Sequence, residues 1–444
     1  MHNYTREDII RIVEEEDVAF IRLQFTDIFG TLKNMAVTVG QLEKALNNKC
    51  MFDVSSLEGI EGEEDCDMYL YPDLSTFEIF PWRPQQGKVA RLICDVYRKD
   101  GTPYEGDPRY VLRKAVAEAE EMGYSMNVGP ECEFFLFHTD EDGLPTTVTH
   151  EKGGYFDIGP LDLGENARRD MILTLAEMGF EIISSHHEIA PAQHEIDFHY
   201  DEAMVTADNL MTFKMVVKTI AKRHGLHATF MPKPKSETYG SGMHINLSLY
   251  GRDGMNVLYN AEDVNGLSEE GYYFIGGLMK HMKGITALTN PLVNSYKRLV
   301  PGYEAPVYIA WSTTNRSPLI QISAGKGAAT KVELRSPDSA ANPYLALAVC
   351  LEAGLDGIRN KIMPPKSENC NLFEISLEEC HKKGIEVLPG TLYEAVQEME
   401  KDPLIKKVLG EDMFTKYVDA KHAEWDESKR QITQWELDQY LFRF

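Results

Sequence analysis

The chain has 444 residues, of which 43% are hydrophobic and 10% aromatic, as in globular proteins, and it is long enough for two domains. It contains no uninterrupted apolar run of about eighteen residues, which excludes a typical membrane-spanning helix. The formal net charge of −25 opposes binding to nucleic acid or anionic lipid. The first residues lack the apolar core of a signal peptide, and the seven cysteines include no Cys-x-x-Cys pair, so we expect a cytoplasmic protein without disulfides.

The first part of the chain predicts a small mixed domain over residues 1–103. Thr5 to Asp8 has the pattern of a capping box, which predicts a short helix at the N-terminus. Segments rich in β-branched and aromatic residues follow, and we expect them to form strands at residues 18–29, 33–39, 76–81 and 88–97. The stretch from Gly101 to Pro108 is rich in Gly and Pro and is the expected linker.

The remainder, residues 104–444, predicts a larger second domain in which helices and strands alternate. Hydrophobic periodicity predicts helices at residues 108–122, 166–178, 207–224 and 343–361. The tail at residues 402–444 is charged and has a helical pattern, which we interpret as a contact arm. The fold class expected from this layout is α+β.

Four strand-like segments carry acidic or imidazole side chains that alternate with apolar residues. Alternation places these polar side chains on one face of each strand, so a curved sheet would gather them in one cavity. Any one of these glutamates would more often be an ordinary surface residue, but the set is rich in oxygen ligands and suits Mg²⁺ or Mn²⁺ better than zinc or copper. The candidate ligands are Glu131, Glu133, Glu188, Glu195, His244 and Glu333.

Basic residues gather close to the last of these ligands and predict an anion site. Arg298, Arg316, Lys331 and Arg335 lie within forty positions, and arginine can bind carboxylate or phosphate oxygens with two hydrogen bonds. No Walker motif or Gly-x-Gly-x-x-Gly segment is present in the sequence, so a nucleotide would be held through metals and arginines. The residues by themselves predict a metal-dependent enzyme that acts on anions, with a nucleotide among them.

Two glycine-containing loops complete this pattern. Gly240-Ser-Gly-Met-His244 has two glycines directly before a candidate ligand, which lets the backbone approach a bound molecule closely. Pro301-Gly-Tyr-Glu304-Ala-Pro306 has a proline at each end and a central carboxylate, as expected of a firm loop that lies over a site. An ordinary turn is the alternative interpretation of each.

These motifs occur in an order that resembles bacterial type I glutamine synthetase over essentially the whole chain. The resemblance rests on Gly-Pro-Glu131-Cys-Glu133, on His186-His-Glu188 to Glu195, on the two loops above, on Asn315-Arg-Ser and on Glu333-Leu-Arg335-Ser-Pro-Asp. It implies a β-grasp-like N-terminal domain and a catalytic domain built on a curved antiparallel sheet flanked by helices. It also implies a dodecamer of two stacked hexameric rings with shared active sites, and no control by adenylylation.

The resemblance further implies ATP-dependent formation of L-glutamine from L-glutamate and ammonia through γ-glutamyl phosphate, with two divalent metals at each site. One metal would be held by Glu133, Glu188 and Glu195, and the second by Glu131, His244 and Glu333. The catalytic groups implied are Asp53 of an adjoining subunit, Glu304 on the lid and Arg316 at the phosphoryl group. Substrate would bind at Glu133, Glu188, Gly240, Arg298 and Arg335, and nucleotide at Asn246, Ser248, Arg316, Gln321 and Lys331.

Five positions depart from the pattern of the family: Val54, Gly62, Tyr239, Gln321 and Lys331. Tyr239 and Val54 lie where the amino acid and ammonium are expected, Gln321 and Lys331 replace arginines, and Gly62 replaces an arginine linked to feedback inhibition. Three hypotheses follow: a glutamine synthetase, a γ-glutamyl ligase that uses another amine or acid, and a weakly active or inactive regulatory relative.

Overall fold

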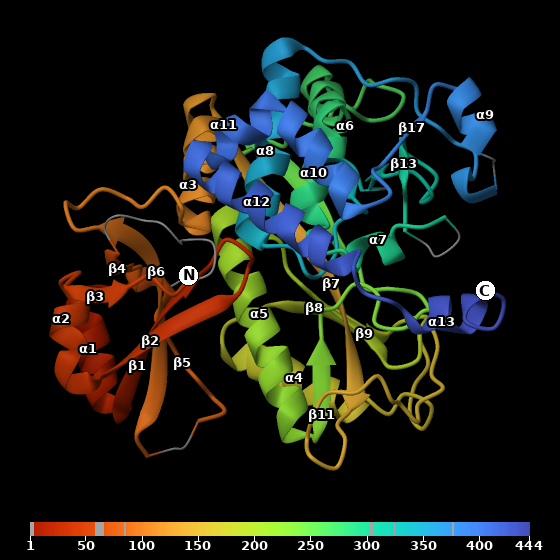
Figure 1. The fold of residues 1–444 in the computed structure, drawn as a ribbon. Helices are drawn as coiled ribbons and strands as arrows, with labels where there is room; N and C mark the ends of the chain where they lie inside the picture. Colours follow the sequence, from red (N-terminus) through yellow and green to blue (C-terminus); the bar gives the residue numbers. More distant parts are fainter. Residues whose placement is uncertain (1–3, 58–65, 84–85, 302–304, 324, 375–376) are drawn as a thin grey trace.

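The computed structural model of the chain describes residues 4–57, 66–83, 86–301, 305–323, 325–374 and 377–444. Its N-terminal part is a six-stranded sheet with the order β2-β1-β6-β4-β3, in which β5 also pairs with β6 (Figure 1). The β1–β6 pair is parallel and the other pairs are antiparallel. The elements are α1 (Arg6–Glu15), β1 (Val18–Thr26), β2 (Leu32–Thr38), α2 (Leu42–Leu46), β3 (Cys50–Asp53), β4 (Asp67–Pro72), β5 (Glu78–Ile79) and β6 (Lys88–Arg98).

The rest of the chain is built on a nine-stranded sheet with the order β14-β15-β16-β12-β7-β9-β8, and β10 and β11 also pair with the long strand β7. Its pairs are antiparallel except β14–β15, and a separate pair joins β13 to β17. The strands are β7 (Tyr124–His138), β8 (Ile182–His187), β9 (Gln193–Phe198), β10 (Asp201–Glu202), β11 (Leu226–Thr229), β12 (Met243–Gly251), β13 (Tyr308–Ile309), β14 (Trp311–Ser312), β15 (Ile320–Ile322), β16 (Val332–Leu334) and β17 (Glu386–Val387).

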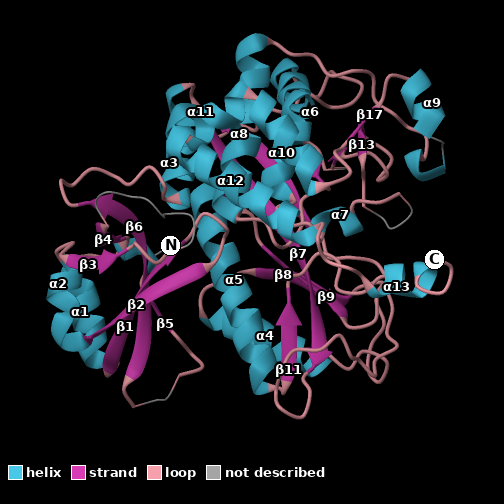
Figure 2. Ribbon diagram, in the orientation of Figure 1, coloured by secondary structure: helices cyan, strands magenta, loops and turns pink. Residues whose placement is uncertain are grey.

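Helices cover this larger sheet. Figure 2 shows α4 and α5 beside the strands, a group around α6, α8, α10 and α12 above them, and α13 projecting at the C-terminus. The helices are α3 (Pro108–Glu121), α4 (Glu165–Glu177), α5 (Ala203–Arg223), α6 (Glu269–Thr289), α7 (Ser295–Arg298), α8 (Pro343–Asn360), α9 (Leu377–Lys382), α10 (Leu392–Lys401), α11 (Pro403–Leu409), α12 (Glu411–Ser428) and α13 (Gln434–Tyr440). Among the described residues, no helix has the length and apolarity that a membrane crossing requires.

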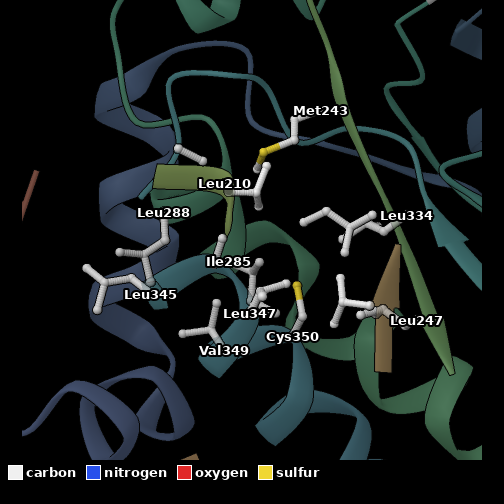
Figure 3. Packing of buried hydrophobic residues seen from close by; sticks show 14 of the residues in the cluster. Leu210, Met243, Leu247, Ile285, Leu288, Leu334, Leu345, Leu347, Val349 and Cys350 are labelled. Carbon is white, nitrogen blue, oxygen red and sulfur yellow. The ribbon is translucent and has the colours of Figure 1, made fainter. Parts of the chain in front are cut away.

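The buried hydrophobic residues form two main clusters. One lies within the N-terminal sheet and its helices and includes Ile21, Leu70 and Leu92. The second fills the space between the larger sheet and its helices. Leu247 from β12, Ile285 from α6 and Cys350 from α8 belong to it (Figure 3). An α+β fold with a small N-terminal sheet and a larger, mainly antiparallel sheet is therefore confirmed.

Most of the expected elements are present, and one long helix was not expected. Helix α6 runs for 21 residues and is buried on most of its surface, so its sequence lacks the polar stripe that marks a surface helix. It packs on α8 at backbone distance, because a Cβ on Gly277 would lie 2.0 Å from the carbonyl oxygen of Ala353, and one on Gly357 would lie 1.9 Å from that of Tyr273. Only glycine fits this contact.

Candidate active site

Strand β7 brings the candidate ligands together because of its register with its two neighbours. Its Glu131 lies opposite His244 of β12, and its Glu133 lies opposite Glu195 of β9. Glu333 joins from β16, which pairs with the far side of β12. Since side chains alternate between the two faces of a strand, the apolar neighbours of these residues enter the core while the polar ones share the other face.

That face lines a cavity of about 400 Å³. Among its lining residues are nine that the sequence predicted as site residues: Glu131, Glu133, Glu188, Glu195, Gly240, His244, Arg298, Arg316 and Arg335. Acidic and basic groups that are far apart in the sequence therefore meet at one place. Alternation predicted the share that comes from the strands, Glu131 and Glu133 of β7, Glu195 of β9 and His244 of β12.

One group of candidate metal ligands consists of Glu131, His244 and Glu333, whose ligand atoms all lie within 4.8 Å of one another. The Nδ1 atom of His244 is 3.2 Å from Oε2 of Glu131 and 3.5 Å from Oε1 of Glu333. Asn246 donates a hydrogen bond of 2.9 Å to Oε1 of Glu131. Burial raises the pKa of Glu131, but the hydrogen bonds from His244 and Asn246 outweigh burial and lower it to about 2. This carboxylate is therefore ionised and ready to bind a cation.

A second group consists of His186, Glu188 and Glu195, again with ligand atoms within 4.8 Å. The Nε2 atom of His186 lies 2.7 Å from Oε1 of Glu188. Glu133, which the resemblance places with these two glutamates, lines the same cavity, and its Oε2 accepts hydrogen bonds from Gln193 Nε2 (2.8 Å) and from a backbone N–H (2.9 Å). The set predicted from sequence thus gains an imidazole.

The carboxylates of this site repel one another in the absence of a cation. Burial and the charge of Glu188 raise the pKa of Glu133 to about 7. Burial and the neighbouring charges of Asp197 and Glu133 raise the pKa of Glu195 well above its usual value. A bound divalent cation would offset this charge, and oxygen atoms with one or two imidazoles are the ligands that Mg²⁺ and Mn²⁺ accept. The residues present therefore fit a divalent metal centre.

Arg298 supplies buried positive charge beside these acids. Its guanidinium donates to the carbonyl oxygens of Ser336 (2.6 Å) and Pro337 (3.3 Å), which fixes its orientation. Burial lowers its pKa, although Glu133 opposes that shift. A Cβ on Gly242 would come within 2.5 Å of Arg298 Nη2, so glycine at this position lets the loop lie directly against the guanidinium.

Two further arginines line the cavity. Arg335 pairs through Nη1 with Oε1 of Glu333, whereas its buried Nε has no hydrogen-bond partner among the described residues. Arg316 is exposed at the rim. A free donor on one arginine and an exposed guanidinium on another leave groups that an anionic substrate can engage.

The other predicted nucleotide-binding residues lie beside the cavity and do not line it. Ser248 donates to the carbonyl oxygen of Thr330 at 3.3 Å, and the ammonium of Lys331 lies 5.2 Å from the centre of the Tyr200 ring. Gln321 lies opposite Glu333 across the β15–β16 pair, with its Oε1 buried and without a hydrogen-bond partner in the described structure.

The departures near the substrate fall in different surroundings. Tyr239 lines the cavity and packs against Phe135 and Phe137, so its ring forms part of the wall. Val54 is fully buried in the N-terminal cluster. Asp53 is exposed at the end of β3 and is not a lining residue of the cavity of its own chain. Glu304 and Gly62, for which the sequence also made predictions, lie outside the described residues.

Among the lining residues that were not predicted as site residues, His186 and Gln193 contact the acidic groups through their side chains. Gln193 is 1% exposed and bridges Glu133 to the carbonyl oxygen of Gly240 (3.0 Å). The sequence does carry a signal for it, because Gln193 and Glu195 are two apart on one strand and therefore share a face. His186 likewise lies two residues before Glu188.

A third buried group of possible metal ligands consists of Glu151, Asp162, His187 and His194. Its acidic side chains already have partners within the protein. Arg168 lies 2.8 Å from both Asp162 Oδ2 and His194 Nδ1. Glu151 is paired with His187 at 2.6 Å. An internal guanidinium therefore takes the place that a metal would need, and we interpret this group as structural.

Comparisons with known proteins agree with this geometry over the whole chain. The family model described as "Glutamine synthetase, catalytic domain" matches residues 105–440, and "Glutamine synthetase, beta-Grasp domain" matches residues 17–99. The glutamine synthetase of Clostridium saccharobutylicum is 61% identical over 100% of both chains, and that of Staphylococcus aureus strain Mu50 is 55% identical over 99% of both.

Solved structures show the same fold. A complex of GmaS with ADP has a TM-score of 0.89 and 33% identity, covering 98% of this chain and 99% of its own. The Plasmodium falciparum glutamine synthetase has a TM-score of 0.88 and 25% identity, covering 99% of both chains. The resemblance found in the motifs is therefore confirmed.

Proposed function

The chain belongs to the glutamine synthetase family, and from this premise we propose that it joins L-glutamate and ammonia to give L-glutamine at the expense of ATP. The observation that carries the proposal is the meeting of two groups of candidate metal ligands with Arg298 and Arg335 in one cavity. The relatives favour neither a different amine nor a non-catalytic role.

The chemistry requires activation of the side-chain carboxylate of glutamate. A free carboxylate does not react with an amine because it has no good leaving group; transfer of the γ-phosphoryl group of ATP to it creates one, as γ-glutamyl phosphate, which ammonia then attacks. Divalent cations bound to the two ligand groups would spread the charge of the transferring phosphoryl group. We assign Mg²⁺ or Mn²⁺ to these groups from their oxygen-rich chemistry.

The arginines of the cavity then have separate tasks. Arg298 is fixed by backbone carbonyls and Arg335 has a free Nε, so these two are suited to hold the carboxylates of glutamate. Arg316 at the exposed rim is suited to the phosphoryl group, where charge develops during transfer. Tyr239 would form the wall next to the amino acid.

Asp53 and Glu304 complete the proposal as the groups that accept protons from ammonium. Asp53 is exposed and lies outside the cavity of its own chain, which supports its action in the site of an adjoining subunit. We therefore propose the homo-oligomer implied by the family, a dodecamer of two hexameric rings. Exposed apolar residues at the C-terminus support an assembled state: Ile432, Trp435, Leu441, Phe442 and Phe444.

We propose domain bounds of 1–103 for the β-grasp-like domain and 104–444 for the catalytic domain. Their separate hydrophobic clusters support this division, although Ile28, Phe80 and Val89 of the first part pack in the second cluster. A cytoplasmic location completes the proposal.

The test is product formation by the purified protein with ATP, glutamate, ammonium and Mg²⁺ or Mn²⁺, followed as both ADP and glutamine. Equal amounts of the two products are expected. A panel of other amines run in parallel addresses Tyr239 and Val54: an amide formed only with another amine would move the protein to a different γ-glutamyl ligase activity. Absence of turnover, despite bound metal and nucleotide, would contradict the enzymatic proposal.

A further inference from the structure

A larger cavity of about 990 Å³ lies between the N-terminal sheet and α5, which face each other in Figure 1. Its walls come from β1, β2 and the segment after β5 on one side and from α5 on the other. Among its lining residues that the structure describes, none is acidic and six are basic: Arg22, Arg83, Lys214, Lys218, Lys222 and Arg223.

The positive charge of this wall is opposite in sign to the net charge of the protein, which is −25. The chain has 70 acidic and 45 basic residues, so an average wall would contain more carboxylates than cations. Within the part of the chain that the structure describes, none of these six side chains forms an ion pair with a carboxylate. Arg22 donates instead to Asn34 Oδ1 (3.0 Å) and Lys214 to the carbonyl oxygen of Ala341 (3.0 Å).

Two pairs of these cations repel each other, Arg22 with Arg83 and Lys214 with Lys218. Burial and the charge of Arg83 lower the pKa of Arg22, and burial and the charge of Lys218 lower the pKa of Lys214, although Cys132 and Asp338 oppose the shift at Lys214. Removing such groups from water without a counter-charge is unfavourable. An anion bound among them would relieve both the repulsion and the loss of solvation.

We propose that this cavity binds a small anion that carries two or more carboxylate or phosphate groups, a site that goes beyond the proposed function. Its volume is within the range of small-molecule sites. The guanidinium groups of Arg22 and Arg83 can each engage one anionic group with two hydrogen bonds, and Lys218 and Lys222 of α5 line the opposite wall. Phe80 and Trp82, stacked with their ring centres 4.5 Å apart, supply an apolar surface for the carbon frame of the ligand.

The position of the cavity makes occupancy measurable through stability. Its anion would bridge the N-terminal sheet and α5, which packs behind the catalytic strand β7. A ligand that binds only the folded arrangement raises the thermal midpoint by mass action. Direct calorimetry and thermal unfolding therefore report on the same event.

The experiment titrates the intact, full-length oligomer with glutarate, citrate and pyrophosphate by isothermal calorimetry. The protein and buffer are first freed of divalent cations on a chelating resin, so that no metal recruits the anion to the active site and no soluble chelator competes for the cavity. The variants are Lys218→Glu and Arg22→Gln. Lys44→Glu is the matched control, since Lys44 is an exposed helical lysine that does not line the cavity. Glutamine formation without added anion should be unchanged in Lys218→Glu, which shows that the variant is folded.

Binding of at least one anion is expected, with affinity lowered about tenfold or more by each cavity variant and unchanged by the control. Preference for the carboxylates or for pyrophosphate identifies which of the two groups the site accepts. Binding of none of the three, or affinity that Lys218→Glu leaves intact, would overturn the proposal. A structure of the assembled oligomer in which side chains of a neighbouring copy fill the cavity would also overturn it.

Discussion

Replacement of Gln193 by leucine should weaken metal binding although the side chain is not itself a proposed ligand. Its Nε2 donates to the carboxylate of Glu133 (2.8 Å) and to the carbonyl oxygen of Gly240 (3.0 Å). Leucine fills a similar volume but provides no donor. Glu133 would keep only its hydrogen bond from the backbone N–H of Gly242 (2.9 Å), and its carboxylate would lose the group that orients it toward the cavity.

The expected magnitude follows from the type of contact. Loss of a group that orients a metal ligand typically costs about tenfold to a hundredfold in metal affinity, or about 1.4–2.8 kcal/mol. A lone hydrogen bond to a charged group contributes about 1.5–3 kcal/mol, which is of the same size. Activity should therefore return at saturating metal, with a raised half-saturating concentration and a kcat close to that of the unchanged protein.

The assay is calorimetric titration of Mn²⁺ into both proteins, together with rates of glutamine formation across metal concentrations. Gln397→Leu is the control, because Gln397 is partly exposed on α10, does not line the cavity, and donates from its amide to Tyr393 OH (3.0 Å). A lower thermal midpoint with unchanged metal affinity would refute the reasoning, since it would show that Gln193 acts only in packing.

Three other outcomes are expected. Asp208→Asn should lower the free energy of unfolding by about 1.5–3 kcal/mol in urea titrations, because Arg109 loses a buried counter-charge that it binds through two hydrogen bonds (3.0 and 2.9 Å) but keeps its ion pairs with Asp73 and Asp95. A change below about 0.5 kcal/mol would contradict this. Burial lowers the pKa of His281, but hydrogen bonds to Asp402 and Asp356 outweigh it and raise the pKa. The stabilisation by His281 is therefore fully present below pH about 6.5 and is lost as pH rises through the raised pKa. The difference in thermal midpoint between the unchanged protein and His281→Gln should become smaller as pH rises. A difference that does not change with pH would show that the charge of His281 does not contribute to stability. Mg²⁺ or Mn²⁺ at about a hundred times its dissociation constant should add about 2.7 kcal/mol to the stability, seen as a raised midpoint that a chelator reverses; an unchanged midpoint would exclude metal binding to the folded state.

The parts of the fold that the sequence predicted are those whose signal is local. Helix α3 begins at Pro108 after the capping Asp107, and α8 begins at Pro343 after Asn342, which a pattern of caps and prolines can show. Helix α6 was missed because its sides are nearly all buried, and the glycines that seat it against α8 have meaning only once the partner helix is known.

The site divides in the same way. Alternation along β7 and β12 predicted which side chains share a face, and the register of the two strands then brought them together. Which carboxylate groups with which imidazole depends on the rotation of single side chains and on donors such as Gln193, which sequence spacing does not specify. The position of His186 in the second group of candidate ligands is therefore visible only in the structure.

The site forms only when β7 and β12 pair in the correct register. Met243, Ile245 and Leu247 are fully buried on one face of β12, while His244 and Asn246 lie on the other. A shift of one residue in register would exchange the two faces, so imidazole and amide would enter the core and the apolar side chains would face the cavity. Misfolded chains therefore cannot retain a partly working site, and the fraction of a preparation that binds metal should equal the fraction whose strands are correctly aligned.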